Sequence, residues 1–291
     1  MRNVRGIGQD PYLNTRGCPE SSFSTGHPAR RKWRYSLSEI VARKFNAGPV
    51  QLAYIDEGDG EPIVLVHGFA SNKEVNWVYP GWVTTLKRAG RRTIAVDNRG
   101  HGASTKLYDP ALYHTDLMAD DIRALLDHLG LACADVMGYS MGARNTAFLA
   151  RAHGERVRSA ILGGLGIHLV KDGGLPGSIA AALEAPSVED VTDPQGRMFR
   201  VFADQTKSDR LALAACIRGS RQSLSPSEVA QIAVPMLIAV GTKDNIAGSP
   251  HELAALVPGA RALDIPGRDH MLSVGDRVYK EAVLRFLEER P

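Results

Sequence analysis

Short runs of apolar residues alternate with helical patterns along the chain from residue 49 onward. Residues 49–55 alternate apolar and polar positions, which is typical of an edge strand. Continuous apolar runs, typical of strands buried on both faces, follow at 62–66, 92–96, 134–138, 158–163, 235–240 and 260–265. Between them, residues 117–129 place apolar side chains at three- and four-residue spacing, and Gly130 provides a stop. This alternation predicts a mostly parallel sheet with helices on both faces.

One long segment between two of these runs breaks the alternation. Residues 167–227 contain no buried-strand pattern. They hold Gly- and Pro-rich turns, and amphipathic segments near 179–183, 197–202 and 210–217. We therefore expect a small helical cap, inserted before the next strand and lying over one edge of the sheet. Its Gly and Pro content favours an open or mobile entrance.

The first 47 residues differ from the rest of the chain. They mix Gly, Pro, Ser, Asn and Arg without sustained periodicity, and they lack the continuous apolar stretch of a secretory signal. A disordered arm and an over-extended start both fit, and the Arg- and Ser-rich composition leaves an organelle transit peptide as an alternative. Residues 36–44 are expected to form a short helix or to lead into the first strand. We therefore divide the chain into an N-terminal arm, 1–47, and a domain, 48–291.

Composition and charge exclude several classes of protein. A chain of 291 residues with 44% hydrophobic content can bury a core as one large domain without disulfides or a structural metal. No apolar run approaches the ~18 residues that cross a bilayer. The arm holds nine Lys and Arg against three acids, whereas the remainder holds 26 against 29. The domain thus lacks the basic excess that a nucleic-acid-binding face needs, and we expect no nucleic-acid partner.

The most informative motif is Gly-Tyr-Ser-Met-Gly at residues 138–142. It matches Gly-x-Ser-x-Gly, follows the predicted strand at 134–138, and opens a predicted helix at about 141–152. This is the context of a nucleophile elbow, in which a strained turn exposes the serine hydroxyl. The free N–H groups at the start of the helix can stabilise a developing oxyanion. The pattern therefore identifies Ser140 as a candidate nucleophile.

With this motif, the chain resembles the α/β-hydrolase superfamily, and in particular its serine esterase-like members, over residues 49–290. Four segments carry the resemblance: His-Gly-Phe at 67–69, Asp-Asn-Arg-Gly-His-Gly-Ala-Ser at 97–104, the elbow, and the neighbourhoods of Asp244 and His270. The resemblance implies an α/β-hydrolase fold. In that fold a mostly parallel central sheet has helices on both faces, and here a small helical cap is inserted before the acid-bearing strand.

The resemblance also implies a catalytic triad in the chain order Ser, Asp, His. Asp244 stands in Gly-Thr-Lys-Asp directly after the strand near residue 240, and His270 stands in Pro-Gly-Arg-Asp-His after the last strand. Ser140 would then be the nucleophile, His270 the base, and Asp244 the group that orients the imidazole. The superfamily's oxyanion hole implies the backbone N–H groups of Phe69 and Met141.

Other titratable residues compete for these roles. The rival bases lie in the resembling motifs upstream of the serine, where we expect them to shape loops, near helix ends, or in segments with less context: His67, His101, His128, His153, His168 and His251. The nearby rival acids are Asp264 and Asp269, and Asp172, after the strand at 158–163, is the main structural alternative to Asp244.

No motif indicates a metal or a cofactor. The chain has no His-x-x-x-His pair, no cysteine cluster, and no phosphate-binding glycine loop after a strand. We therefore expect a cofactor-free carboxylesterase of broad specificity, one that could take bulky or oligomeric esters. Lactone, thioester or carbon–carbon hydrolysis, cofactor-free perhydrolysis, and a non-catalytic receptor remain alternatives. The expected partner is a small-molecule ester, the expected location is the cytoplasm, and homo-oligomerisation stays open.

Overall fold

Continuous apolar runs form the centre of a single eight-stranded sheet in the computed structural model, which describes residues 41–171 and 175–290. The strands are β1 (Arg43–Ala47), β2 (Val50–Glu57), β3 (Glu61–Val66), β4 (Arg91–Val96), β5 (Ala134–Tyr139), β6 (Val157–Gly163), β7 (Met236–Gly241) and β8 (Arg261–Ile265). Their spatial order is β1-β2-β4-β3-β5-β6-β7-β8. In this order, every pair of neighbouring strands from β4 through β3 to β8 is parallel. The predicted mostly parallel sheet is confirmed.

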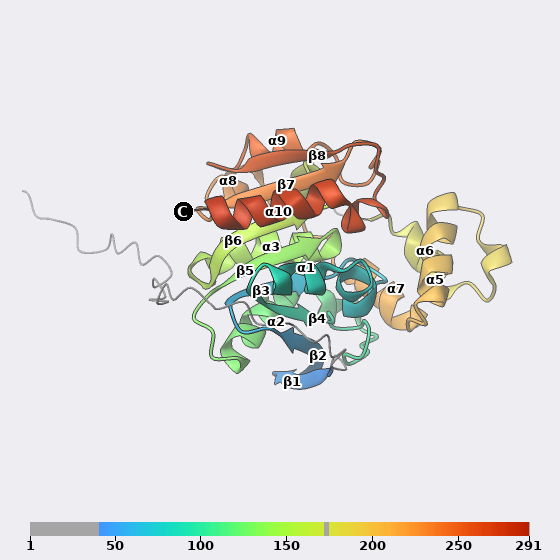
Figure 1. Cartoon of the computed structure of the whole chain (residues 1–291). Coiled ribbons are helices and arrows are strands. Elements are labelled where there is room, and N and C mark those ends of the chain that lie inside the picture. Colours follow the sequence, from blue (N-terminus) through green and yellow to red (C-terminus); the bar gives the residue numbers. More distant parts are fainter. Residues whose placement is uncertain (1–40, 172–174, 291) are drawn as a thin grey trace, which may run out of the picture.

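Two groups of helices cover the two faces of the sheet (Figure 1). The helices are α1 (Trp82–Arg88), α2 (Thr115–His128), α3 (Met141–Ala152), α4 (His168–Lys171), α5 (Ser178–Glu184), α6 (Pro194–Gln205), α7 (Arg210–Gly219), α8 (Pro226–Val229), α9 (Pro250–Ala254) and α10 (Arg277–Glu289). Helices α1 and α10 pack on one face, and α2, α3, α8 and α9 pack on the other. A π-helix spans Glu74–Val78, and single 3₁₀ turns span Pro110–Tyr113, Gly154–Arg156, Val188–Asp190 and Ser273–Gly275.

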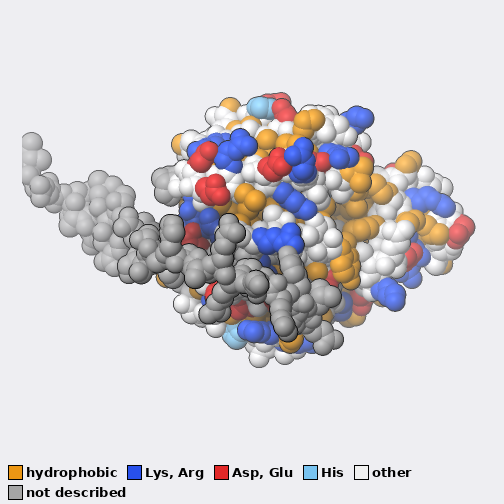
Figure 2. Space-filling view, viewed as in Figure 1, with side chains coloured by type: hydrophobic (Ala, Val, Ile, Leu, Met, Phe, Trp, Pro, Cys, Tyr) orange, Lys and Arg blue, Asp and Glu red, His pale blue; other side chains and the backbone are white. Residues whose placement is uncertain are grey.

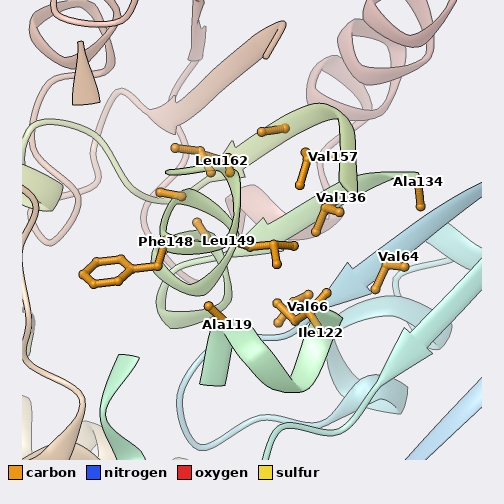
Figure 3. Packing of buried hydrophobic residues seen from close by; sticks show 14 of the residues in the cluster. Val64, Val66, Ala119, Ile122, Ala134, Val136, Phe148, Leu149, Val157 and Leu162 are labelled. Carbon is orange, nitrogen blue, oxygen red and sulfur yellow. The ribbon is translucent and has the colours of Figure 1, made fainter. Parts of the chain in front are cut away.

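The core between the sheet and α3 shows why these residues form these elements. Val64 and Val66 of β3 and Val136 of β5 belong to one buried cluster with Ile122 of α2 and Leu149 of α3 (Figure 3). A strand that helices cover on both faces exposes neither row of its side chains to solvent. Its sequence is therefore a continuous apolar run rather than an alternation of apolar and polar residues. The apolar spacing of α2 turns one of its faces onto this cluster.

The sheet begins earlier than the sequence indicates. Residues 43–47, which the sequence assigns to the arm, form β1 and pair antiparallel with β2. Only Phe45 and Ala47 of this strand are buried, so the alternation is too short to stand out in the sequence. Residues 1–40 of the predicted arm lie outside the described residues, so the part of the segment 36–44 that falls there is not described.

The segment between β6 and β7 is helical and extends away from the sheet, with α5 and α6 furthest out (Figure 1). Helix α5 packs against α6 and α7. Apolar residues of α5, α6 and α7 form a cluster with Phe69 and Met141 of the main body. Figure 2 shows hydrophobic side chains gathered where this helical insertion joins the body. The insertion therefore lies over the carboxyl end of β5.

No helix in the described part of the chain is long and apolar enough to cross a membrane. On the face seen in Figure 2, Lys and Arg side chains are interspersed with Asp and Glu rather than gathered in one patch.

Candidate active site

The carboxyl ends of β3 and β5 lie side by side where the chain changes direction through the sheet. From β3 the chain moves to β4 on one side, and from β5 it moves to β6 on the other. In open parallel sheets this reversal leaves a crevice in which ligands bind. The loop after β3 carries Phe69, and the turn after β5 carries Ser140, so both residues line this crevice.

The turn at Ser140 has the strained backbone that its sequence predicts. Ser140 has φ 53° and ψ −112°, a region that non-glycine residues rarely occupy. Its N–H donates to the carbonyl of Gly163, and helix α3 begins at the next residue. The strain turns the hydroxyl outward from the end of the sheet.

Glycine at 142 is required because α3 passes very close to β3. A Cβ atom at Gly142 would lie 2.1 Å from the carbonyl oxygen of Val66 and 2.6 Å from that of His67. Both contacts are to backbone, so relief requires that the helix move away from the strand. Because α3 packs this closely on the end of β3, the turn at Ser140 is held against the loop that carries Phe69.

We expect Gly142→Ala to lower the free energy of unfolding by about 2–3 kcal/mol, because overpacking of this kind forces backbone shifts. Gly154→Ala, just beyond the other end of α3, is the matched control. Its new methyl group would meet nothing closer than 3.9 Å, so we expect a change within about 0.5 kcal/mol. Urea denaturation of both variants measures the difference, and equal stabilities would contradict the steric argument.

Three residues from distant parts of the sequence meet at this turn. Ser140 Oγ lies 2.9 Å from Nε2 of His270, and Nδ1 of His270 lies 2.7 Å from Oδ2 of Asp244. The side chain of Asp244 is fully buried, and that of His270 is 7% exposed. The structure thus brings together the three residues that the sequence predicts for a triad.

Asp244 and His270 are each held in place by further hydrogen bonds. Oδ1 of Asp244 accepts from the N–H groups of Ile246 and Ala247, which leaves Oδ2 for the imidazole. The hydroxyl of Tyr139 donates to the carbonyl of His270 across 2.6 Å. A carboxylate that accepts from Nδ1–H fixes the tautomer in which Nε2 can accept the serine proton.

The two predicted oxyanion donors lie on opposite sides of Ser140. Met141 is the first residue of α3, and Phe69 lies in the loop after β3. Within the described residues, neither backbone N–H has a hydrogen-bond partner. A Cβ atom at Gly68 would lie 3.4 Å from that of Ser140, so this loop lies directly against the turn.

Asn76, which the sequence analysis does not identify, fixes the loop that carries Phe69. Its buried Oδ1 accepts the N–H of Gly68 across 2.9 Å. Asn76 belongs to the π-helix, a rare element that is frequent at functional sites. No sequence motif marks it, because the contact depends on how that helix packs.

The rival residues are engaged elsewhere. His67 accepts the N–H of Asn98, and its Nδ1 lies 2.7 Å from the carbonyl of Gly68. Burial lowers the pKa of His67, and it lowers the pKa of His101 to about 3, so both imidazoles are neutral. His128 lies in the last turn of α2, and His153 caps the end of α3.

Among the described rival acids, neither Asp264 nor the side chain of Asp269 bonds to the imidazole of His270. Asp264 pairs with the exposed His251, and Asp269 accepts the N–H groups of Met271 and Leu272. Asp172 lies outside the described residues.

Two cavities meet at Ser140. The larger, of about 330 Å³, extends beneath the helical insertion, and the smaller, of about 150 Å³, extends toward His270. Phe69 and Ser140 line both. Among the described residues, no group of three or more His, Cys, Asp or Glu side chains could hold a metal ion.

Comparisons with known proteins agree with this architecture. The family model for the alpha/beta hydrolase fold matches residues 61–175. The non-heme chloroperoxidase CPO-A1 of Kitasatospora aureofaciens is 39% identical over 117 residues, which cover 39% of this chain and 40% of the relative. The 2-(acetamidomethylene)succinate hydrolase of Mesorhizobium japonicum is 26% identical over 86% of this chain and 96% of its own length.

A solved structure extends the likeness to nearly the whole fold. The bromoperoxidase from Bacillus anthracis superposes with a TM-score of 0.71 at 23% identity, over 86% of this chain and 100% of that chain. At this level of identity the likeness establishes the fold alone. The sequence match to the chloroperoxidase spans less than half of that relative.

Proposed function

The chain belongs to the α/β-hydrolase superfamily, and on that basis we propose that it is a serine hydrolase that cleaves carboxylic esters. The observation that carries the proposal is the hydrogen-bonded series from Ser140 through His270 to Asp244, at 2.9 and 2.7 Å. The series ends in a cavity large enough for a small-molecule substrate.

The proposed reaction has two halves. Ser140 Oγ attacks the acyl carbon while Nε2 of His270 takes the hydroxyl proton, and Asp244 stabilises the resulting imidazolium. The N–H groups of Phe69 and Met141 bind the oxyanion of the tetrahedral intermediate. His270 then protonates the departing alkoxide, leaving an acyl-enzyme. In the second half, His270 takes a proton from water, whose oxygen attacks the acyl carbon. The bond between the acyl carbon and Ser140 Oγ then breaks, His270 returns the proton to Oγ, and the acid is released.

The cavity volumes narrow the substrate range. A volume of about 330 Å³ is at the lower end of those of small-molecule sites, so it favours acyl groups of modest size over oligomeric ones. The sequence favours a cytoplasmic enzyme that acts on a small-molecule ester, either as a single chain or as a homo-oligomer.

Perhydrolysis is the second candidate, because one similar protein is named a chloroperoxidase and one similar structure a bromoperoxidase. Here hydrogen peroxide replaces water in the second half. It gives a proton to His270 and attacks the acyl carbon, which releases a peracid and restores the serine. The same triad serves both reactions, so only the second nucleophile differs.

Initial rates on p-nitrophenyl esters from acetate to laurate test the proposal. We expect turnover that is fastest for short and medium acyl groups, as the cavity volume requires. A parallel assay with acetate, peroxide and bromide, read by halogenation of monochlorodimedone, distinguishes perhydrolysis. If the folded protein binds esters without turning any of them over, it is a receptor and the hydrolase proposal is wrong.

A further inference from the structure

The larger cavity at Ser140 is lined by hydrogen-bond donors and by no carboxylate among the described residues. Its polar lining comes from both the body and the helical insertion: Arg144, His168, Gln195, Ser220, Arg221 and Asn245. The rest of its wall is largely apolar. Two guanidinium groups, those of Arg144 and Arg221, thus line one concave site, an arrangement that attracts anions.

Arg221 has no partner within the described residues. It follows α7 and is exposed, and no residue of the described ranges forms a hydrogen bond or an ion pair with its guanidinium. A Cβ atom at Gly177, just before α5, would lie 3.2 Å from its Nη1. The guanidinium therefore lies at the wall of the cavity, beside the loop that precedes α5.

Arg144 contributes charge but is already engaged. It is 4% exposed and donates from Nη1 to the carbonyl of Gln222 and from Nη2 to the carbonyl of His168. These bonds hold the segments on either side of the cavity. Arg221 is thus the guanidinium that remains available to a ligand, and Gln195 and Asn245 add uncharged amide donors nearby.

The position of His270 decides which half of a substrate enters this cavity. His270 lines the smaller cavity and not the larger one. The leaving oxygen must lie within hydrogen-bond reach of Nε2 to receive its proton, so the leaving group faces the smaller cavity. The acyl group then extends into the larger cavity, toward Arg221.

We propose that the enzyme acts on esters or lactones whose acyl part carries a carboxylate, and that Arg221 binds this carboxylate. This inference rests on the proposed ester hydrolysis. A guanidinium presents paired N–H donors that match a carboxylate, which makes it suited to such a ligand. Because Arg221 is exposed, solvent and salt screen the interaction, and its contribution is moderate.

The test compares p-nitrophenyl monoesters of adipate and suberate with neutral esters of the same chain length. We expect the wild type to favour the acidic esters, through KM rather than kcat.

Arg221→Gln is expected to lower the ratio of kcat/KM for acidic over neutral esters about fivefold. Arg221→Glu is expected to reverse the preference toward p-nitrophenyl 6-aminohexanoate, and high salt is expected to weaken the wild-type preference. The matched control is Arg285→Gln, which changes an exposed arginine on α10 that pairs with no described acid, and it is expected to leave the ratio unchanged.

Direct binding separates this inference from the proposed function. Titration calorimetry with adipate and its uncharged diamide, adipamide, on the Ser140→Ala protein needs no turnover. Adipate binding that weakens in Ser140→Ala/Arg221→Gln supports the inference even if no ester is hydrolysed, an outcome that would contradict the hydrolase proposal alone. Equal binding of adipate and adipamide, or a ratio of kcat/KM that Arg221→Gln leaves unchanged, overturns it.

Discussion

Ser140→Ala is expected to lower kcat for p-nitrophenyl esters at least about 10⁴-fold, because it removes the only atom proposed to attack the acyl carbon. His270 has no other hydroxyl to activate at this position, since its Nε2 contacts Ser140 Oγ. The oxyanion donors are backbone groups and survive the change, so slow hydrolysis above the rate in water should remain. Substrate binding should change little, because a single hydroxyl is removed from a large cavity.

Ser220→Ala is the matched control for this prediction. Ser220 lines the same cavity, but its hydroxyl donates to the carbonyl of Cys216 rather than to a histidine. We expect its kcat to stay within about tenfold of the wild type. A fluorophosphonate probe adds an independent measurement, since it should modify Ser140 in the wild type and in Ser220→Ala but not in Ser140→Ala. Equal activities of the two variants would exclude Ser140 as the nucleophile.

The elements that the sequence predicts best are those whose own residues determine them. Helix α3 begins at Met141 and ends at Ala152, as predicted, because the elbow before it and the loss of apolar spacing after it are local signals. The buried strands β3 to β7 agree with their apolar runs to within about one residue, since burial on both faces requires such runs. The run at 260–265 also forms a strand, but β8 is the edge of the sheet and only its Ile265 is buried. The order of the triad residues along the chain follows from the family resemblance, and the geometry brings them together.

The parts that the sequence could not predict depend on contacts between distant segments. The ion pair of Lys73 with Asp97, 2.7 Å long and buried, supports the loop after Phe69, yet neither residue belongs to a pattern that marks the pair. The position of Arg221 depends on how α5 and α7 pack, which amphipathic spacing alone does not determine. An arginine after a helix is ordinarily a solvated residue, so only its place in the cavity distinguishes it.

Asp244→Asn is the second variant expected to lose most of its activity, with kcat lowered about 10⁴-fold although the side chain keeps its shape. Oδ1 of Asp244 accepts two backbone N–H groups, so the amide oxygen of the asparagine must take that place. The amide NH₂ group then faces Nδ1 of His270 and donates to it. Nδ1 becomes an acceptor, the imidazole proton moves to Nε2, and His270 can no longer accept the proton of Ser140.

Two neighbouring carboxylates provide the controls. Asp264→Asn removes an ion pair with the exposed His251, and Asp269→Asn weakens a turn beside His270 without touching the imidazole. We expect Asp264→Asn to retain nearly full activity and Asp269→Asn to lose far less than Asp244→Asn. Steady-state kinetics on p-nitrophenyl butyrate, with circular dichroism to verify folding, decides between them. Because the wrong tautomer impairs proton transfer and not substrate binding, the loss in Asp244→Asn should fall on kcat with KM nearly unchanged. A loss confined to KM, or a larger loss in Asp269→Asn, would assign the orienting carboxylate to another residue.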